Sequence, residues 1–226
     1  PGGYRVTGEK RWTSDAHTSQ YLWLLGRSGP RAFTLLMLDL TSPGVTIRPI
    51  WTIDGHRLNE VVLDEVFVPD ADRVGLDGQA WNLIREALAV ERHLMVLPGR
   101  VRRDYEDLLE WAGHGGWFDD PVVAEALLDT AIDLAEVETS ALCSLAAMEA
   151  GGDGVVEAAR AKLLASRAIQ RMARIPFVVG DVTATDMDGD PAFLWHETVM
   201  ETIAGGTSEV MLGLVARNAL GLGARR

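Results

Sequence analysis

The chain is poor in cysteine, in basic residues and in long apolar runs, and each scarcity excludes a class of protein. Cys143 is the one cysteine among 226 residues, so no disulfide can form within the chain. This is typical of a reducing compartment and predicts a cytoplasmic protein. Lys and Arg number 21 against 33 Asp and Glu, a net charge of −12, which argues against binding to nucleic acid or to an anionic membrane surface. No apolar stretch reaches the roughly 20 residues of a membrane-spanning helix.

Metal-ligand spacings and common nucleotide-binding motifs are also missing. The five histidines are scattered, with no cysteine or carboxylate at ligand spacing, so we expect no metal. P-loop, GxSxG and GxGxxG patterns do not occur. No signal peptide is recognisable, and the chain opens on a Pro-Gly-Gly turn rather than on methionine, from which we expect a piece of a longer protein. Cys143 falls in an apolar helical stretch, where we expect it to be buried and inert.

The chain changes character near residue 77. Residues 1–76 are rich in β-formers broken by turn signals at short spacing, which predicts an antiparallel sandwich or partial barrel. From residue 77 to residue 226 the apolar period is that of helices. An acidic cap at Asp120 followed by Pro121 predicts one helix start. The expected fold class is α+β, a β segment followed by a C-terminal antiparallel helical bundle, with helices near 78–111, 121–150, 154–179, 192–203 and 207–221.

Glu91 is the most informative single residue. Alternating steps of three and four along the first helix place it in a stripe with Trp81, Ile84, Leu88 and Met95. A carboxylate on an apolar face is costly to ionise unless it is paired, and desolvation raises its pKa, so such a group is a candidate general base. The alternative is that Glu91 lies at the edge of the stripe or pairs with an Arg from another helix.

Two further segments are candidate ligand contacts. Gly205 and Gly206, followed by Thr207, would let the backbone approach a ligand at a helix start, although a plain glycine-hydroxyl helix cap explains the same pattern. The indole of Trp12 could stack against a flat cofactor, and the hydroxyl groups of Thr13 and Ser14 could donate hydrogen bonds to it. Its alternative is a Trp that covers the sheet beside a small polar turn.

Four segments, in this order, resemble the acyl-CoA dehydrogenase family. The first looks like the strand that leads to a flavin-contacting tryptophan, the second like the end of the β-domain, the third like the start of the C-terminal helical domain, and the fourth like the terminal active-site motif. The match covers nearly the whole chain but corresponds only to the back part of a family member. The segments are residues 3–12 (GYRVTGEKRW), 59–69 (NEVVLDEVFVP), 78–81 (GQAW) and 203–210 (IAGGTSEV).

The resemblance implies α,β-dehydrogenation of an acyl-CoA thioester with FAD. In this family a carboxylate removes the proton α to the carbonyl and a hydride passes from the β-carbon to flavin N5. Most members carry the base directly before the Gly-Thr pair of the terminal motif, where this chain has Gly205. A subset, including isovaleryl- and long-chain-type enzymes, carries it on the first helix of the C-terminal domain just before an Arg, which here is Glu91 before Arg92.

The family resemblance also implies roles for the remaining candidate residues. Trp12 would pack on the flavin, with Thr13 beside it and Ser14 near N5. Thr207 and Glu209 would lie near the cofactor. Arg92, Gly205 and Gly206 would shape the substrate site. An electron-transferring flavoprotein is the acceptor that the family implies.

Two departures from the family pattern bear on partners. The stretch 111–120 (WAGHGGWFDD) lacks the Arg that in the family reaches the FAD of a neighbouring subunit. The stretch 178–184 (VVGDVTA) lacks the double glycine that cradles the pyrophosphate, and Asp181 would repel phosphate. This pattern is similar to that of subunits that pair with a different, family-related chain, as in heteromeric enzymes of bacterial sterol catabolism. The chain is therefore expected to be a catalytic subunit of a homo- or hetero-oligomer or, alternatively, a non-catalytic partner subunit.

Overall fold

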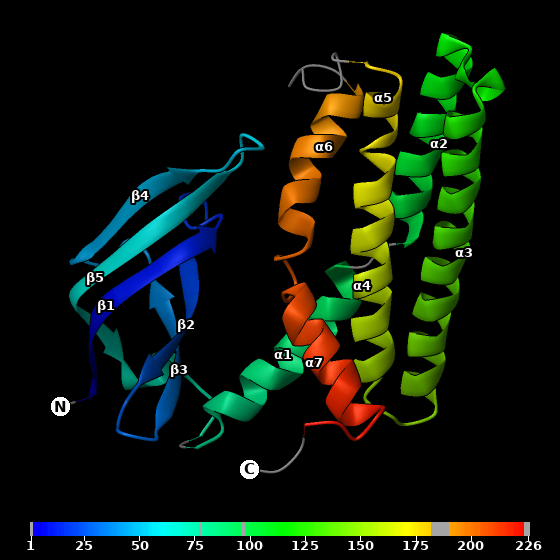
Figure 1. The fold of residues 1–226 in the computed structure, drawn as a ribbon. Coiled ribbons are helices and arrows are strands. Elements are labelled where there is room, and N and C mark those ends of the chain that lie inside the picture. Colours follow the sequence, from blue (N-terminus) through cyan, green and yellow to red (C-terminus); the bar gives the residue numbers. More distant parts are fainter. Residues whose placement is uncertain (1, 77, 96–97, 182–189, 224–226) are drawn as a thin grey trace. The chain divides into compact units, whose positions relative to one another are not determined.

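The computed structural model describes residues 2–76, 78–95, 98–181 and 190–223. The chain divides into two compact units, Pro1–Ala87 and Leu88–Arg226. This division falls inside the first helix. The expected order of a β segment followed by a helical bundle is confirmed (Figure 1).

The first unit contains two antiparallel three-stranded sheets, in the orders β1-β5-β4 and β2-β3-β6. Apolar side chains of both sheets form one core, which includes Leu24, Leu38 and Val61. This confirms the antiparallel arrangement that the short strand spacing predicts. The elements are β1 (Gly3–Ser14), β2 (Tyr21–Arg27), β3 (Phe33–Asp39), β4 (Val45–Trp51), β5 (Arg57–Pro69), a 3-10 turn (Asp70–Asp72) and β6 (Arg73–Val74).

A bulge explains why the alternation along β5 is loose. Val61 and Leu63 are buried with a period of two, but the next buried residue is Val66. The register on β1 shifts at the same place, and Glu65 has a φ of 48°. Because one extra residue exchanges the two faces of a strand, the bulge returns the apolar residues to the core side.

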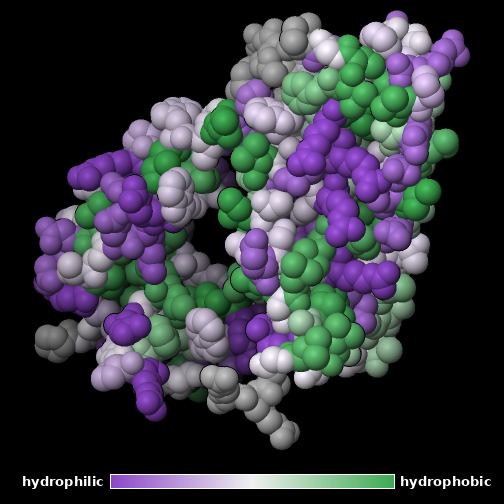
Figure 2. Space-filling model, viewed as in Figure 1, coloured by the Kyte–Doolittle hydropathy of each residue, from purple (hydrophilic) through white to green (hydrophobic). Residues whose placement is uncertain are grey.

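The second unit is a helical bundle built on α2, α3 and α4. Its core includes Leu108, Val123, Val137 and Met172. Figure 2 shows hydrophilic residues gathered along the visible side of α4, with hydrophobic residues beside them. The helices are α1 (Ala80–Met95), α2 (Pro98–Gly115), α3 (Pro121–Glu149), α4 (Val155–Met172), α5 (Ile175–Val178), α6 (Asp190–Glu201) and α7 (Ser208–Asn218), with a 3-10 turn at Trp117–Asp119.

Two helix boundaries differ from prediction and one is confirmed. The expected helix 78–111 is two helices, because Pro98 lacks a backbone N–H and begins α2. The expected helix 154–179 stops at Met172, and a short α5 with Pro176 follows. Asp120 caps α3 as predicted, since its carboxylate accepts from the N–H groups of Val122 and Val123. Within the described ranges, no helix has the length and apolarity needed to cross a membrane.

The tip of the β4–β5 hairpin is held by Asp54, which is only 6% exposed. Its carboxylate accepts from the Thr52 hydroxyl and, at 3.3 Å, from the His56 N–H, and lies 3.0 Å from His56 Nδ1. Burial by itself raises the pKa of Asp54, but the hydrogen bonds from Thr52 and His56 outweigh it and lower that pKa below its usual value.

We expect Asp54→Asn to destabilise the protein by about 1–3 kcal/mol at pH 7. Since the folded pKa is the lower one, the carboxylate stabilises the fold above the unfolded value of about 3.9, and this contribution disappears as the pH falls through the folded pKa. Urea unfolding at pH 7 and at pH 3 measures the difference, with the exposed Asp64→Asn as control. An Asp54→Asn deficit of the same size at both pH values would contradict the account.

Candidate functional site

Trp12 lies at a second bulge, on β1. Lys10 pairs with Val61 and Thr13 pairs with Asn59, so β1 carries one extra residue here. Trp12 has a φ of 62°, a left-handed conformation that is uncommon for a bulky residue and costs roughly 1–2 kcal/mol. The bulge turns the indole outward, where it is 62% exposed. Strained backbone of this kind concentrates at ligand sites, because a bulge re-aims a side chain.

Asn59 fixes the strand that follows the bulge. It is fully buried, and its Nδ2 donates to the Thr13 carbonyl at 2.9 Å and lies 3.2 Å from His17 Nδ1. Among the described residues, its Oδ1 has no hydrogen-bond partner. Beside this anchor, Thr13 is half-buried and Ser14 is exposed. An open indole next to hydroxyl groups suits a flat ligand with polar edges.

Glu91 is exposed on α1, contrary to the expectation of a desolvated carboxylate. Trp81 and Leu88 of the same stripe are 54% and 41% exposed, so the described residues do not bury this face. The apolar period therefore marks a face that the described part of the chain leaves open. Among the described side chains, none forms an ion pair or hydrogen bond with Glu91. The side chain of Arg92 lies outside the described residues.

The Gly205-Gly206-Thr207 segment forms a tight turn into α7. Both glycines are left-handed, with φ values of 66° and 105°, and a Cβ on Gly206 would lie 2.5 Å from Met211 Cε. Thr207 caps α7, because its hydroxyl accepts from the Val210 N–H at 3.3 Å. A hydrogen bond from its own backbone N–H, and then one from Thr207, lower the pKa of Glu209. The capping interpretation is thus confirmed, and a ligand contact by the same turn remains a prediction.

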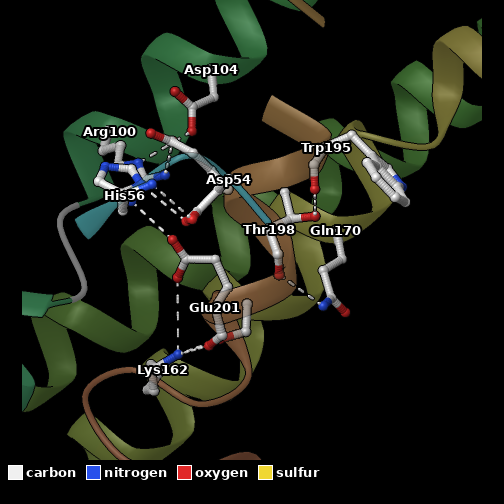
Figure 3. A network of polar contacts seen from close by, with 11 residues as sticks. Asp54, His56, Arg100, Asp104, Lys162, Gln170, Trp195, Thr198 and Glu201 are labelled. Carbon is white, nitrogen blue, oxygen red and sulfur yellow. Dashed lines mark hydrogen bonds and ion pairs between the residues drawn. The ribbon is translucent and has the colours of Figure 1, made fainter. Parts of the chain in front are cut away.

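A buried network holds the end of α6, just before this turn (Figure 3). Lys162 and Ser166 of α4, both under 5% exposed, donate to the carbonyl oxygen of Glu201, from Ser166 at 2.8 Å. Gln170 donates to the Thr198 carbonyl at 3.1 Å, one turn earlier on α6. These bonds satisfy carbonyl groups at a helix end, which otherwise lack intrahelical partners.

Arg100, at the start of α2, joins the same network from the other side. Its guanidinium lies 2.9 Å from carboxylate oxygens of Glu197 and of Glu201. It also lies 3.6 Å from Asp104, where burial raises the carboxyl pKa and Arg100 partly offsets the rise. Charged side chains of α2 and α4 therefore both bind residues of α6, which joins the three helices. This network was not predicted from the sequence. A lysine among the alanines of α4 could have indicated it, because a buried cation needs acceptors from another element.

The Lys162–Ser166 pair has the composition of a nucleophilic dyad but not its access. Lys162 Nζ donates to Ser166 Oγ at 2.6 Å, and burial lowers the Lys162 pKa. A Ser nucleophile must reach a substrate, whereas these side chains are 4% and 3% exposed and already bind Glu201. The pair is a structural contact between α4 and α6.

The predicted site residues thus form three groups. Trp12, Thr13 and Ser14 are contiguous on the β1 bulge, Gly205 to Glu209 are contiguous on the α7 turn, and Glu91 lies on α1. Asp181, the acid expected to repel phosphate, accepts from Trp111 Nε1 at 3.1 Å. Cys143, expected in the core, is exposed and lines a groove between α3 and α4.

We expect Lys162→Met to destabilise the fold by about 3 kcal/mol, because it removes a buried donor to the Glu201 carbonyl and leaves Arg100 as the only cation beside the Glu201 carboxylate among the described residues. Chemical denaturation of the wild type and the variant measures the loss. Arg167→Met, an exposed cation on the same helix, is the matched control and should change stability little. Equal stabilities of the Lys162 and Arg167 variants would contradict the account.

Comparison with known proteins agrees with this architecture. Residues 78–220 match the family model for the acyl-CoA dehydrogenase C-terminal domain. Acyl-CoA dehydrogenase FadE34 of Mycobacterium tuberculosis is 34% identical over 98% of this chain and 32% of its own length. Acyl-CoA dehydrogenase IpdE1 of Mycolicibacterium smegmatis is 28% identical over 96% of the chain and 57% of its own length. The chain therefore spans about a third to three fifths of these relatives.

Solved structures show the same fold. The Tcur3481-Tcur3483 steroid ACAD aligns with a TM-score of 0.89 at 25% identity, over 98% of this chain and 61% of that one. The ChsE4-ChsE5 complex from Mycobacterium tuberculosis aligns with a TM-score of 0.86 at 26% identity, over 99% and 63%. With the family model matched over more than half of its residues, the chain belongs to the acyl-CoA dehydrogenase family, of which it forms the C-terminal part.

Proposed function

We propose that this chain is the base-carrying part of an FAD-dependent acyl-CoA dehydrogenase, with Glu91 as the catalytic base. The observation that carries the proposal is an exposed carboxylate, with no ion-pair partner among the described residues, at the family's alternative base position in a chain whose terminal motif holds glycine. Gly205 is left-handed and has no side chain, so that turn supplies no base. An acid held in a structural ion pair could not serve, and no described residue pairs with Glu91.

The proton to be removed is that on the carbon α to the thioester carbonyl. This proton is too weakly acidic for a carboxylate in water, so the base must be desolvated once the ligands are in place. Leu88, one turn before Glu91 on the exposed stripe, supplies apolar surface for that enclosure. We infer that bound ligands and the remainder of the protein cover the stripe, because the described residues do not.

The residues of the β1 bulge fit an isoalloxazine ring. The outward indole of Trp12 offers a stacking surface, and Thr13 and Ser14 offer hydroxyl groups at its edge. Thr207 and Glu209 would contact the cofactor at the start of α7. Bound FAD would supply the acceptor for the β-hydride, and Glu91 would hold the α-proton. Arg92, Gly205 and Gly206 would line the thioester site, where Gly205 brings no side chain.

We further propose assembly with a related subunit and reoxidation by an electron-transferring flavoprotein. Two similar solved structures, Tcur3481-Tcur3483 and ChsE4-ChsE5, each carry the names of two proteins. The first is described as a steroid ACAD. A sterol-derived acyl-CoA is accordingly the first substrate to test, with straight-chain acyl-CoA thioesters as comparison. The second candidate function, a non-catalytic partner subunit, is favoured by Asp181 at the position where the family cradles phosphate.

Glu91→Gln in the full-length protein, assembled with its partner, should lower acyl-CoA-dependent dye reduction by roughly 10²–10⁴-fold while flavin content is unchanged. The amide keeps the shape of the side chain but cannot accept the proton. Glu86→Gln, an exposed neighbour on the same helix, is the control and should retain activity. Full turnover by the Glu91 variant would exclude it as base and favour the partner-subunit function.

Trp12→Gly should lower flavin retention about tenfold while the fold remains at least as stable, because glycine adopts the left-handed φ without strain. The flavin-to-protein absorbance ratio and a thermal melt separate the two effects. Trp51→Ala, which removes a 67% exposed indole from β4, is the control. Undiminished flavin content in the Trp12 variant would contradict the proposed stacking.

A further inference from the structure

The outer face of α3 carries a regular row of exposed residues. Leu128, Ile132 and Leu142 are 67%, 61% and 67% exposed. Ala135 and Thr139 fill the steps between them and are also exposed. Steps of four and three repeat along the row, so these side chains form one seam about 21 Å long. We call these five residues the α3 row.

The opposite side of α3 is already the core of the bundle. Val123, Leu127, Leu134 and Val137 are buried there. The helix is therefore apolar on two sides, and a helix of this kind is normally covered on both. In the described chain, α2 and α4 cover only one of them.

A groove runs beside the α3 row. Its volume is about 280 Å³, and Ile132, Glu136 and Cys143 line it from α3, with Arg160 opposite on α4. A ridge of side chains from another helix could pack into such a groove, as ridges pack into grooves between neighbouring helices.

Charge identifies the kind of helix that fits. The segment Pro121–Glu149 contains six acidic residues and no Lys, Arg or His. Arg102 neutralises Glu138, and Arg171 lies 3.4 Å and 3.2 Å from Asp129 and Asp133. The remaining three acids have no ion-pair partner among the described residues, and they are Glu125, Glu136 and Glu149.

We propose that the α3 row binds an amphipathic helix of a related, non-identical subunit, with an apolar stripe flanked by Lys or Arg. Pairing with α3 of a second copy would set these acids against the same acids, which is unfavourable. A basic-flanked helix instead neutralises Glu125 and Glu136 while it covers the row. This inference rests on the proposed assembly with a related subunit and names the face that makes it.

The test is co-expression of the full-length protein with a candidate family-related subunit, followed by co-purification. Ile132→Glu with Leu142→Glu should abolish the complex and leave the thermal melt of the unpartnered protein unchanged, since both positions are exposed. Val122→Glu, exposed on the same helix but outside the row, should leave the complex intact. Glu136→Lys should weaken the complex at least tenfold, because it places cation against cation.

Cys143 gives a second measurement that needs no variant in the row. Its maleimide labelling should be at least tenfold slower in the complex than in the unpartnered protein. An intact complex with the double variant, or unchanged labelling of the wild type on assembly, would overturn the proposal. So would a self-association that Glu136→Lys strengthens, which would identify a second copy as the occupant. These readouts do not involve turnover, so they are independent of whether Glu91 is the base.

Discussion

The bond between the buried Lys162 ammonium group and the Glu201 carbonyl oxygen is the contact on which the helical unit most depends. It satisfies a carbonyl group at the C-terminal end of α6, before the glycine turn, and Arg100 of α2 pairs with the carboxylate of the same residue. A buried cation is tolerated here because acceptors surround it. These contacts join three helices near the start of α7. They therefore also fix the position of the turn at Thr207, which caps α7.

Local signals in the sequence predicted much of the fold. The acidic cap and proline that begin α3, and the threonine that begins α7, act through neighbouring backbone groups, so their effect is readable from adjacent residues. Where tertiary packing decides, prediction was weaker. The bulge at Glu65 was visible only as loose alternation, and the break at Pro98 was passed over because the apolar period continues across it.

The candidate site shows the same division. Trp12 was predicted from its neighbours and from the family resemblance, but its left-handed backbone depends on the pairing of the next residue, Thr13, with Asn59 of β5, 46 residues further along the chain. The apolar surroundings of Glu91 on α1 and of Cys143 on α3 predict buried side chains, whereas both side chains are exposed. Apolar periodicity along a helix predicts that one face will be buried, but it does not identify the partner that buries it. We propose that bound ligands cover the face of α1 and that another subunit covers the outer face of α3.

The central claim is that Glu91 takes the α-proton of an acyl-CoA thioester. The most direct measurement is exchange of that proton with solvent deuterium, followed by mass spectrometry on a bound acyl-CoA analogue that cannot lose the β-hydride. Exchange reports proton removal alone, separately from oxidation. The account predicts exchange by the wild-type assembly and none above background when position 91 is glutamine and the flavin remains bound. Exchange at the wild-type rate in that variant would contradict it.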